Sequence, residues 1–341
     1  MKFDFIIGNP PYQEEVANKG DRPNPVYDKF MEESFSLAPV VELITPGRFL
    51  FNAGQTSKEW NKKMLGDPHI KVLSYYPKSS DVFENVDIKG GVAITLRNAN
   101  AEFGKIGTFT AFSELNSIVG KVKKIDKYFL NDVVASQGIY RFSKKAFEEH
   151  PEIDTVSGNG TGSKIVSSLV EKLPDIFLAT KPRDGSYIEM IGRSTSGRFS
   201  KYILREYLED VNYTDAYKVI IPEANGTGAI GEVLSTPLIG EPLIGVTDTF
   251  LCVGCFDNIE EAEALFKYIK TKFARCMLGV NKVTQHNPKS TWKDVPMQVF
   301  TKDSDIDWSK SISEIDQQLY KKYNLTEEEI AFIESHVKEM S

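Results

Sequence analysis

A tetrapeptide near the start of the chain, Asn9-Pro10-Pro11-Tyr12, has residue types suited to a binding or catalytic turn. It directly follows Phe3–Ile7, a short apolar run that is stopped by Gly8 and that predicts a buried strand. Ligands of α/β folds bind at the carboxyl ends of such strands, which is where this tetrapeptide lies. The alternative is a stiff turn without function, because two prolines fix the backbone and any aromatic residue could follow them.

The segment FDFIIGNPPY resembles the amino-methylation motif of DNA methyltransferases that modify the exocyclic amine of adenine, and sometimes of cytosine. Further segments are similar to the gamma-type, adenine-specific enzymes of bacterial restriction–modification systems (type IIG-like), namely VYDKFMEESF, ITPGRF and SSDVFENVDIKGGVAITL. Three later segments resemble the target-recognition domain of that family: ANGTGAIGEVLSTPLIG, FKYIKTKFAR and VTQHNPKSTWKDVPMQVF. The resemblance covers most of the chain and implies a site-specific DNA adenine methyltransferase that uses S-adenosylmethionine.

The resemblance assigns catalytic roles to five residues. The side-chain oxygen of Asn9 and the carbonyl of Pro10 would accept hydrogen bonds from the target amine and so localise its lone pair. Pro10 and Pro11 would hold these acceptors still, which is the preorganisation that electrostatic catalysis needs. Because the base must leave the duplex, Tyr12 would stack on one face of the adenine and Phe83 on the other. Phe83 is equally well interpreted as an ordinary core residue.

The family holds its cofactor on a glycine-rich turn upstream of this motif, and no such turn precedes Asn9 here. We therefore expect an incomplete S-adenosylmethionine site, without assignable cofactor-binding residues, and a second polypeptide that carries the missing half. One alternative is a circular permutation in which Gly226-x-Gly228-x-x-Gly231 and Asp248 form the cofactor loop and its ribose acid. Pro237 and Pro242 would interrupt the helix that such a loop must open.

The net charge of −7 comes from 41 basic and 48 acidic side chains, and the last 41 residues contribute ten acidic side chains against five basic ones. Residues 267–293 carry seven basic side chains and no acidic one, and residues 181–205 carry six against two. Local positive charge interspersed with base-reading side chains is typical of a DNA-binding surface. We therefore predict that double-stranded DNA binds through Lys267, Lys270, Lys272, Arg275, Lys282, Gln285, His286, Lys289, Lys293, Arg193 and Arg198. The alternative is a basic face that only confers solubility.

Two other patterns could do chemistry. Cys252-x-x-Cys255 with Cys276 and His286 has the ligand count of a zinc site, but TFLCVGCF predicts a strand in which residues three apart point to opposite faces. Asp81 with Asp87-Ile88-Lys89 fits a magnesium-dependent nuclease site loosely. We predict no metal. Two competing functions stay open, a DNA-recognition module without activity and a restriction endonuclease component.

The first 100 residues alternate between strand and helix patterns. Apolar runs predict strands at Phe3–Ile7, Val40–Ile44, Ile70–Tyr76 and Val92–Leu96. Helices are predicted over Val26–Leu37 and, with Ser57 as the cap, as far as Leu65. The last two strands lie too close for a helical crossover, so we expect them to be antiparallel. This predicts an α/β fold containing the second half of a Rossmann-like methyltransferase sheet, whose first strand lacks its usual outer neighbours.

We expect a partial catalytic domain over residues 1–112, a mixed α+β target-recognition domain over 113–305 and a C-terminal helical segment over 306–341. In the middle region, glycine-rich stretches such as 158–162 should interrupt short strands, with few helices. The C-terminal helices should span Ser309–Tyr323 and start again at Thr326, with Glu329 completing a capping box. No apolar run approaches the roughly 20 residues of a membrane span, and neither a signal-peptide pattern nor a disulfide framework is present. We therefore expect a cytoplasmic protein without a membrane partner.

Overall fold

The chain consists of two compact units, Met1–Asn116 (unit 1) and Ser117–Ser341 (unit 2). The computed structural model describes residues 3–14, 23–52, 55–84, 88, 90–226, 230–282 and 285–340. The division falls within helix α3 (Ser113–Ile125).

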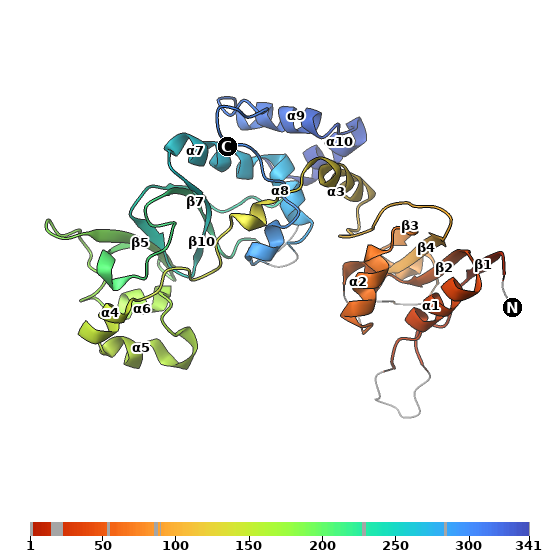
Figure 1. The fold of residues 1–341 in the computed structure, drawn as a ribbon, viewed down its shortest axis with the longest axis horizontal. Helices are drawn as coiled ribbons and strands as arrows, with labels where there is room; N and C mark the ends of the chain where they lie inside the picture. Colours follow the sequence, from red (N-terminus) through yellow and green to blue (C-terminus); the bar gives the residue numbers. More distant parts are fainter. Residues whose placement is uncertain are drawn as a thin grey trace. The chain divides into compact units, whose positions relative to one another are not determined.

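Unit 1 is built on a four-stranded sheet with the strand order β1-β2-β4-β3 (Figure 1). The strands are β1 (Phe5–Gly8), β2 (Val40–Pro46), β3 (Ile70–Tyr76) and β4 (Val92–Asn98). β1 is parallel to β2, whereas β4 lies antiparallel between β2 and β3. The predicted α/β class and the antiparallel pairing of the last two strands are therefore confirmed.

The described part of unit 1 also contains the helices α1 (Tyr27–Leu37) and α2 (Lys58–Gly66) and the 3-10 helices η1 (Gly47–Phe51) and η2 (Ser79–Asp81). The predicted cap of α2 is confirmed, because the hydroxyl of Ser57 accepts a hydrogen bond from the Trp60 amide at 3.1 Å. Apolar side chains of α1, α2 and η1 pack on those of β2, β3 and β4, and this core includes Met31, Leu43, Phe49, Trp60, Met64, Ile70 and Ala93.

Strand β1 forms one edge of this sheet, and within the described part of the chain its only strand neighbour is β2. The side chains of Phe5 and Ile7 are 50% and 69% exposed, whereas Ile6 packs on the core. Native sheets normally protect such an edge, because its unpaired backbone groups can pair with another strand. The described side chains therefore leave the β1 edge and its apolar face accessible to a further strand.

Unit 2 contains two three-stranded sheets, ordered β10-β7-β8 and β6-β5-β9. Their strands are β5 (Tyr187–Ser194), β6 (Gly197–Leu204), β7 (Tyr217–Pro222), β8 (Leu238–Gly240), β9 (Ile244–Val246) and β10 (Phe250–Phe256). β5 and β6 form an antiparallel hairpin, and β9 joins β5 in parallel. One core joins these sheets, since Met190, Ile220 and Cys252 belong to the same buried cluster.

Helices gather at two ends of the sheets of unit 2 (Figure 1). One group comprises α4 (Lys144–Glu149), α5 (Glu152–Thr161) and α6 (Ser167–Lys172). The other comprises α7 (Ile259–Lys270), α8 (Lys272–Gly279), α9 (Ile312–Lys322) and α10 (Glu327–His336). The described part of unit 2 also contains the 3-10 helices η3 (Leu130–Asp132), η4 (Arg205–Tyr207) and η5 (Lys289–Trp292).

The expectation of few helices in the middle of the chain was therefore wrong. The glycine-rich stretch beginning at residue 158 forms the end of helix α5 instead of a break between strands. Glycine lowers helix propensity by about 1 kcal/mol relative to alanine, but tertiary packing overrides propensity. The fully buried Ile153 belongs to the main core of unit 2 and attaches the start of α5 to it.

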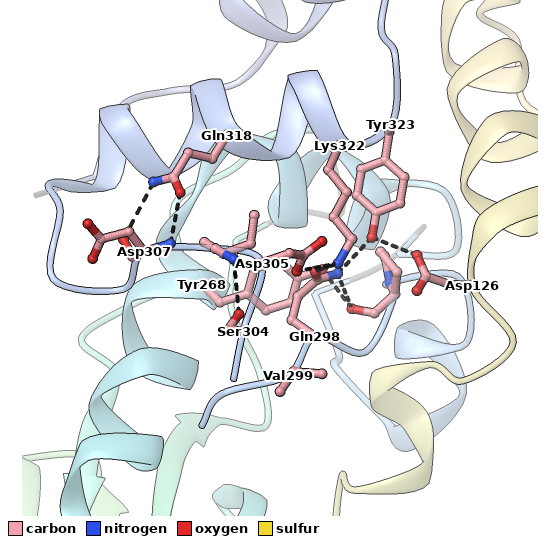
Figure 2. Close-up of polar contacts among 12 residues, drawn as sticks. Asp126, Tyr268, Gln298, Val299, Ser304, Asp305, Asp307, Gln318, Lys322 and Tyr323 are labelled. Carbon is pink, nitrogen blue, oxygen red and sulfur yellow. Dashed lines mark hydrogen bonds and ion pairs between the residues drawn. The ribbon is translucent and has the colours of Figure 1, made fainter. Parts of the chain in front are cut away.

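The C-terminal helices are part of unit 2 and do not form a body of their own. Both predicted helices are present, and the capping box of Thr326 and Glu329 is confirmed. Figure 2 shows how α9 is attached: the Tyr323 hydroxyl donates to Asp126 at 2.7 Å and accepts from the Gln298 amide at 2.7 Å. Lys322 bonds to Gln298 and Asp305 at 2.9 and 3.0 Å (Figure 2).

Across the described residues, no helix combines the length and the apolar character that spanning a membrane would need.

Candidate functional site

The tetrapeptide Asn9–Tyr12 leaves the carboxyl end of β1, at the same edge of the sheet as the end of the parallel strand β2. The chain then turns back, because the Tyr12 carbonyl accepts a hydrogen bond from the Val26 amide at 3.1 Å and Gln13 pairs with Pro25. Asn9 and Pro11 are exposed, whereas Pro10 and Tyr12 are half-buried. The turn therefore presents a polar amide and an aromatic ring at the edge where α/β folds bind ligands.

A cavity of about 270 Å³ lies beside this turn. Drug-sized ligands occupy pockets of about 300–1,000 Å³, so this cavity is of a size for a small ligand. Its described lining combines aromatic and polar side chains with one charged side chain, and consists of Tyr12, Gln13, Pro25, Tyr27, Pro46, Arg48, Gln55 and Ile88.

Of the five residues predicted to be catalytic, only Tyr12 lines this cavity among the described residues. Phe83 does not line it: the Phe83 ring is half-buried, and its amide bonds to the Ser79 carbonyl at 2.8 Å in the turn after η2. The Ser79 hydroxyl in turn accepts a hydrogen bond from Ile88, which does line the cavity. The stacking role of Phe83 stays a prediction.

The sequence reasoning missed the polar lining residues Tyr27, Arg48 and Gln55. The end of β2 carried a usable signal for Arg48, because parallel strands β1 and β2 end at the same edge and Pro46-Gly47-Arg48 follows directly. Tyr27 and Gln55 come from α1 and from the loop before α2, and only packing brings them here.

Two glycines shape the wall that carries Arg48. A β-carbon on Gly90, whose φ is +87°, would lie 2.4 Å from Cγ of Arg48. The neighbouring Gly91 has a φ of +68°, and its carbonyl accepts a hydrogen bond from the Gly47 amide at 2.9 Å. Glycine is therefore required at residue 90, because any larger residue would displace the Arg48 stem that lies against it.

Four buried polar atoms on or next to the cavity lining have no hydrogen-bond partner in the described parts of the chain. They are Tyr12 Oη, Asp28 Oδ1, Thr45 Oγ1 and Trp60 Nε1. Burial also raises the pKa of the Tyr12 hydroxyl to about 12, so this group stays protonated at neutral pH. Buried groups of this kind occur where a ligand or water completes a site. The region around Tyr12 therefore contains hydrogen-bonding atoms that no described protein group satisfies.

The alternative cofactor loop around Gly226–Gly231 does not open a helix. Residues 227–229 lie outside the described residues, and the chain from Glu232 leads into strand β8. The supposed ribose acid, Asp248, is engaged elsewhere: its carboxylate accepts from the Ser167 amide at 2.9 Å and its carbonyl accepts from Gln137 at 3.0 Å. Without a helix N-terminus to meet a phosphate or carboxylate, this loop lacks the mechanism of a dinucleotide site.

The two candidate metal patterns are also dispersed. Cys252 is fully buried in β10 and Cys255 is exposed, and no group of three metal-ligating side chains forms among the described residues. His286 Nδ1 instead lies 3.0 Å from a carboxylate oxygen of Glu223. Of the nuclease pattern, Asp81 is exposed, while Asp87 and Lys89 lie outside the described residues.

The basic segment 267–293 does not form one exposed face, which corrects the predicted DNA-binding surface. Arg275 is only 2% exposed and Lys282 only 4% exposed. Arg275 donates to backbone carbonyls, with Nε 3.1 Å from Lys270 O and Nη2 bonded to Lys338 O. Lys282 donates to the Asn225 carbonyl at 2.6 Å and lies 3.5 Å from Glu232. Both cations are therefore structural, because buried charges must be paired or hydrogen-bonded.

The ammonium groups of the three lysines of α7 and α8 already interact with other groups of unit 2. Lys267 donates to the carbonyls of Trp308 and Lys310, at 2.7 and 3.1 Å. Lys272 pairs with Glu334 of α10, and Lys270 lies 4.7 Å from the centre of the Phe266 ring. The acidic C-terminal helices thus neutralise part of the basic segment.

The remaining predicted DNA-binding residues are exposed: Gln285, His286, Lys289, Lys293, Arg193 and Arg198. Residues 285–287 run alongside residues 223–225, with Asn225 N donating to Gln285 O and Asn287 N donating to Glu223 O, both at 2.7 Å. Arg193 and Arg198 face each other across the β5–β6 hairpin. Six of the eleven residues predicted to bind DNA are therefore exposed to solvent.

The structural role of Arg275 leads to a stability prediction. Arg275→Ala should lower the free energy of unfolding of unit 2 by about 3 kcal/mol, because several buried carbonyls lose their charged donor. The exposed Lys289→Ala should change it by less than about 0.5 kcal/mol. Urea unfolding followed by circular dichroism compares the two variants, and an equal, small effect of both would contradict the structural role of Arg275.

Comparison with known proteins finds similarity to methylases of restriction–modification systems. Residues 1–83 match the sequence profile of the Eco57I restriction-modification methylase family. An uncharacterized adenine-specific methylase from Mycoplasma pneumoniae is 28% identical over 166 residues, which cover 47% of this chain and 38% of that protein. The chain therefore spans less than half of the length of this curated relative.

Two solved structures are similar to nearly the whole chain at low identity. The type IIG restriction endonuclease BpuSI aligns with a TM-score of 0.32 and 11% identity, covering 98% of this chain and 54% of BpuSI. The type IIL restriction-modification enzyme MmeI, solved in complex with DNA, aligns with a TM-score of 0.36 and 9% identity, covering 97% of this chain and 56% of MmeI.

Proposed function

We propose that this chain is the catalytic-motif and target-recognition part of a site-specific DNA adenine methyltransferase of a restriction–modification system. The observation that supports this most is the position of Asn9–Tyr12, at the carboxyl end of β1 and beside a cavity of about 270 Å³. The profile match of residues 1–83 to the Eco57I restriction-modification methylase family supports the same reaction class.

In the proposed reaction the chain binds and orients the target base. The adenine leaves the duplex, enters the cavity and stacks on the ring of Tyr12, which replaces the stacking that the base loses. The Asn9 side-chain oxygen and the Pro10 carbonyl accept hydrogen bonds from the exocyclic amine. This draws the nitrogen lone pair out of conjugation with the ring, and the two prolines keep the acceptors in place without reorganisation.

S-adenosylmethionine would supply the methyl group, but the described residues do not fit this cofactor. They contain no strand outside β1 and no glycine-rich turn that opens a helix at this edge of the sheet. We infer that the cofactor-binding half lies outside the described residues and that its sheet pairs with the open edge of β1. The exposed apolar side chains of Phe5 and Ile7 support an assembly surface at this strand.

Co-expression tests the proposal without knowledge of the target sequence. The chain is produced with a polypeptide carrying the cofactor-binding half of an Eco57I-type methylase, in a host without adenine methylation, and N6-methyladenine in genomic DNA is measured by mass spectrometry. We expect methylation with both polypeptides and none with either alone. DNA binding without methylation would instead favour the inactive recognition module. Tight calorimetric binding of S-adenosylmethionine to this chain alone would contradict the incomplete cofactor site.

Tyr12 offers a matched pair of variants. Tyr12→Ala should lower methylation by about 10- to 100-fold, since stacking of one base on an aromatic ring is worth about 1–3 kcal/mol. Tyr12→Phe keeps the ring and removes only the hydroxyl, so it should retain most of the activity. The co-expression assay compares the two variants with the wild type. Equal activity of all three proteins would exclude Tyr12 from the base-binding site.

A further inference from the structure

Two segments that are distant in the sequence meet beside the carboxyl end of β7. At the end of the β5–β6 hairpin, the Arg193 amide donates to the Thr249 hydroxyl at 3.0 Å. The Thr249 carbonyl accepts from the Glu223 amide, also at 3.0 Å. Residues 223–225 in turn pair with residues 285–287. The hairpin end and the exposed residues Gln285 and His286 therefore flank one short backbone segment.

The side chains on both flanks are held in defined positions. The Arg198 guanidinium donates to the carbonyl and the hydroxyl of Thr236, both at 3.0 Å, and lies 5.4 Å from the centre of the Phe250 ring. On the other flank, His286 Nδ1 lies 3.0 Å from a carboxylate oxygen of Glu223. These hydrogen bonds already restrict the side chains of Arg198 and His286. Binding of a ligand therefore costs less side-chain entropy than it would with two freely rotating side chains.

The arrangement of Arg193 and Arg198 points to an anionic ligand. The two arginines are directly opposite each other in the antiparallel ladder, where Cβ atoms are about 4.5–5.5 Å apart and like charges are destabilising. Both are exposed, and within the described residues neither forms an ion pair with a carboxylate. A phosphate between them would offset the repulsion, since guanidinium groups bind phosphate oxygens through paired, charge-assisted hydrogen bonds.

The shape of the hairpin end suits a groove of duplex DNA. The residues that join the two arginines are small, Ser194-Thr195-Ser196-Gly197, and the hydroxyls of Ser194 and Ser196 lie 2.8 Å apart. The major groove admits a two-stranded β-ribbon. A narrow polar tip between two arginines can therefore enter the groove while its cations reach the backbone.

We propose that the β5–β6 hairpin end and residues 285–286 form one DNA-contact surface of unit 2. In it, Arg193 and Arg198 hold backbone phosphate, and Gln285 and His286 lie next to them at the base edges. This inference rests on the proposed function, because it takes duplex DNA as the partner of unit 2. Of the eleven residues predicted to bind DNA, it keeps these four and leaves out the cations of residues 267–282, because those cations are largely bonded within the protein.

The salt dependence of DNA binding tests the arginines. Binding of the full chain to a mixed-sequence duplex is measured by fluorescence anisotropy at several salt concentrations. Each phosphate contact contributes about 0.9 to the slope of log K against log salt, so R193Q/R198Q should lower the slope by about 2. Arg193→Gln alone should lower it by about 1. This second variant leaves the Arg198 contacts with Thr236 and Phe250 intact, so it separates lost binding from misfolding.

The double variant K267Q/K272Q is the matched control, because it also removes two positive charges but from positions occupied within unit 2. Its slope should equal that of the wild type. If the slope is lowered in this control and unchanged in both arginine variants, the proposed hairpin surface is wrong. The proposal that unit 2 binds DNA would still stand. No DNA binding by the wild type at low salt would overturn the proposed function as well.

Selection from a randomised duplex pool tests the neighbouring side chains. Gln285→Ala and His286→Ala should weaken the sequence preference selected by the wild type while leaving the salt slope unchanged, because base contacts specify and phosphate contacts position. If both variants select the same duplex sequences as the wild type, residues 285–286 do not read the bases.

Discussion

Asn9→Ala is expected to lower methylation by about 100- to 1,000-fold in the co-expressed enzyme, which is the usual cost of removing one preorganised electrostatic contact. The physical reason is that the exocyclic amine of adenine is a poor nucleophile, since its lone pair is delocalised into the ring. Without the Asn9 oxygen, only the Pro10 carbonyl remains to accept a hydrogen bond from the amine. The exposed Asn9 side chain makes few contacts with the protein, so the fold of unit 1 should be unaffected.

Asn9→Asp is the matched control for this prediction. It has nearly the same shape and keeps an acceptor oxygen, so its activity should lie between those of the wild type and Asn9→Ala. DNA binding should be nearly the same in all three proteins, because the phosphate contacts and the sequence-reading contacts are proposed to lie in unit 2. Methylation that is unchanged in Asn9→Ala would remove this residue from the catalytic site and favour the stiff-turn interpretation of the motif.

Phe5→Asp combined with Ile7→Asp is expected to abolish assembly with the cofactor-binding polypeptide, and methylation with it. Burying one large apolar side chain is worth about 1.5–3 kcal/mol, so the two losses weaken association by about 100-fold or more. The fold of unit 1 should tolerate the double variant, because both side chains are half or more exposed and Ile6 supplies the contact of β1 with the core.

The opposite edge of the same sheet provides the control. Leu73 of β3 is 42% exposed, and Leu73→Asp also places a carboxylate on an exposed apolar position of an edge strand. Only the β1 variant should lose assembly in sedimentation velocity and cofactor binding in calorimetry of the mixed polypeptides. An equal effect of both substitutions would indicate general destabilisation, and no effect of either would place the partner elsewhere.

Together the two predictions separate the chemistry from the assembly. A protein that assembles but does not methylate after Asn9→Ala has lost only the acceptor for the amine. A protein that neither assembles nor methylates after the β1 substitutions has lost its cofactor-binding partner. These outcomes distinguish an incomplete methyltransferase from a recognition module, which would bind DNA regardless of either change.

Local patterns in the sequence determined the elements of unit 1, the C-terminal helices of unit 2 and the position of the motif. Apolar runs of strand length, the Ser57 cap and the Thr326–Glu329 capping box depend on residues within a few positions of each other. Such interactions are nearly independent of the remaining chain, so the elements formed as predicted, with β3 at its predicted bounds. The place of Asn9–Tyr12 at a strand end followed from the same local information.

Only the tertiary structure decided which charged side chains face solvent and which side chains share a cavity with Tyr12. Arg275 and Lys289 are indistinguishable as basic residues of one segment, yet α8 buries Arg275 beneath the C-terminal residues and leaves Lys289 exposed. Tyr27 and Gln55 line the cavity with Tyr12 although they come from α1 and from the loop before α2. Burial and cavity lining arise from contacts between residues far apart in the chain, and no local pattern carries that information.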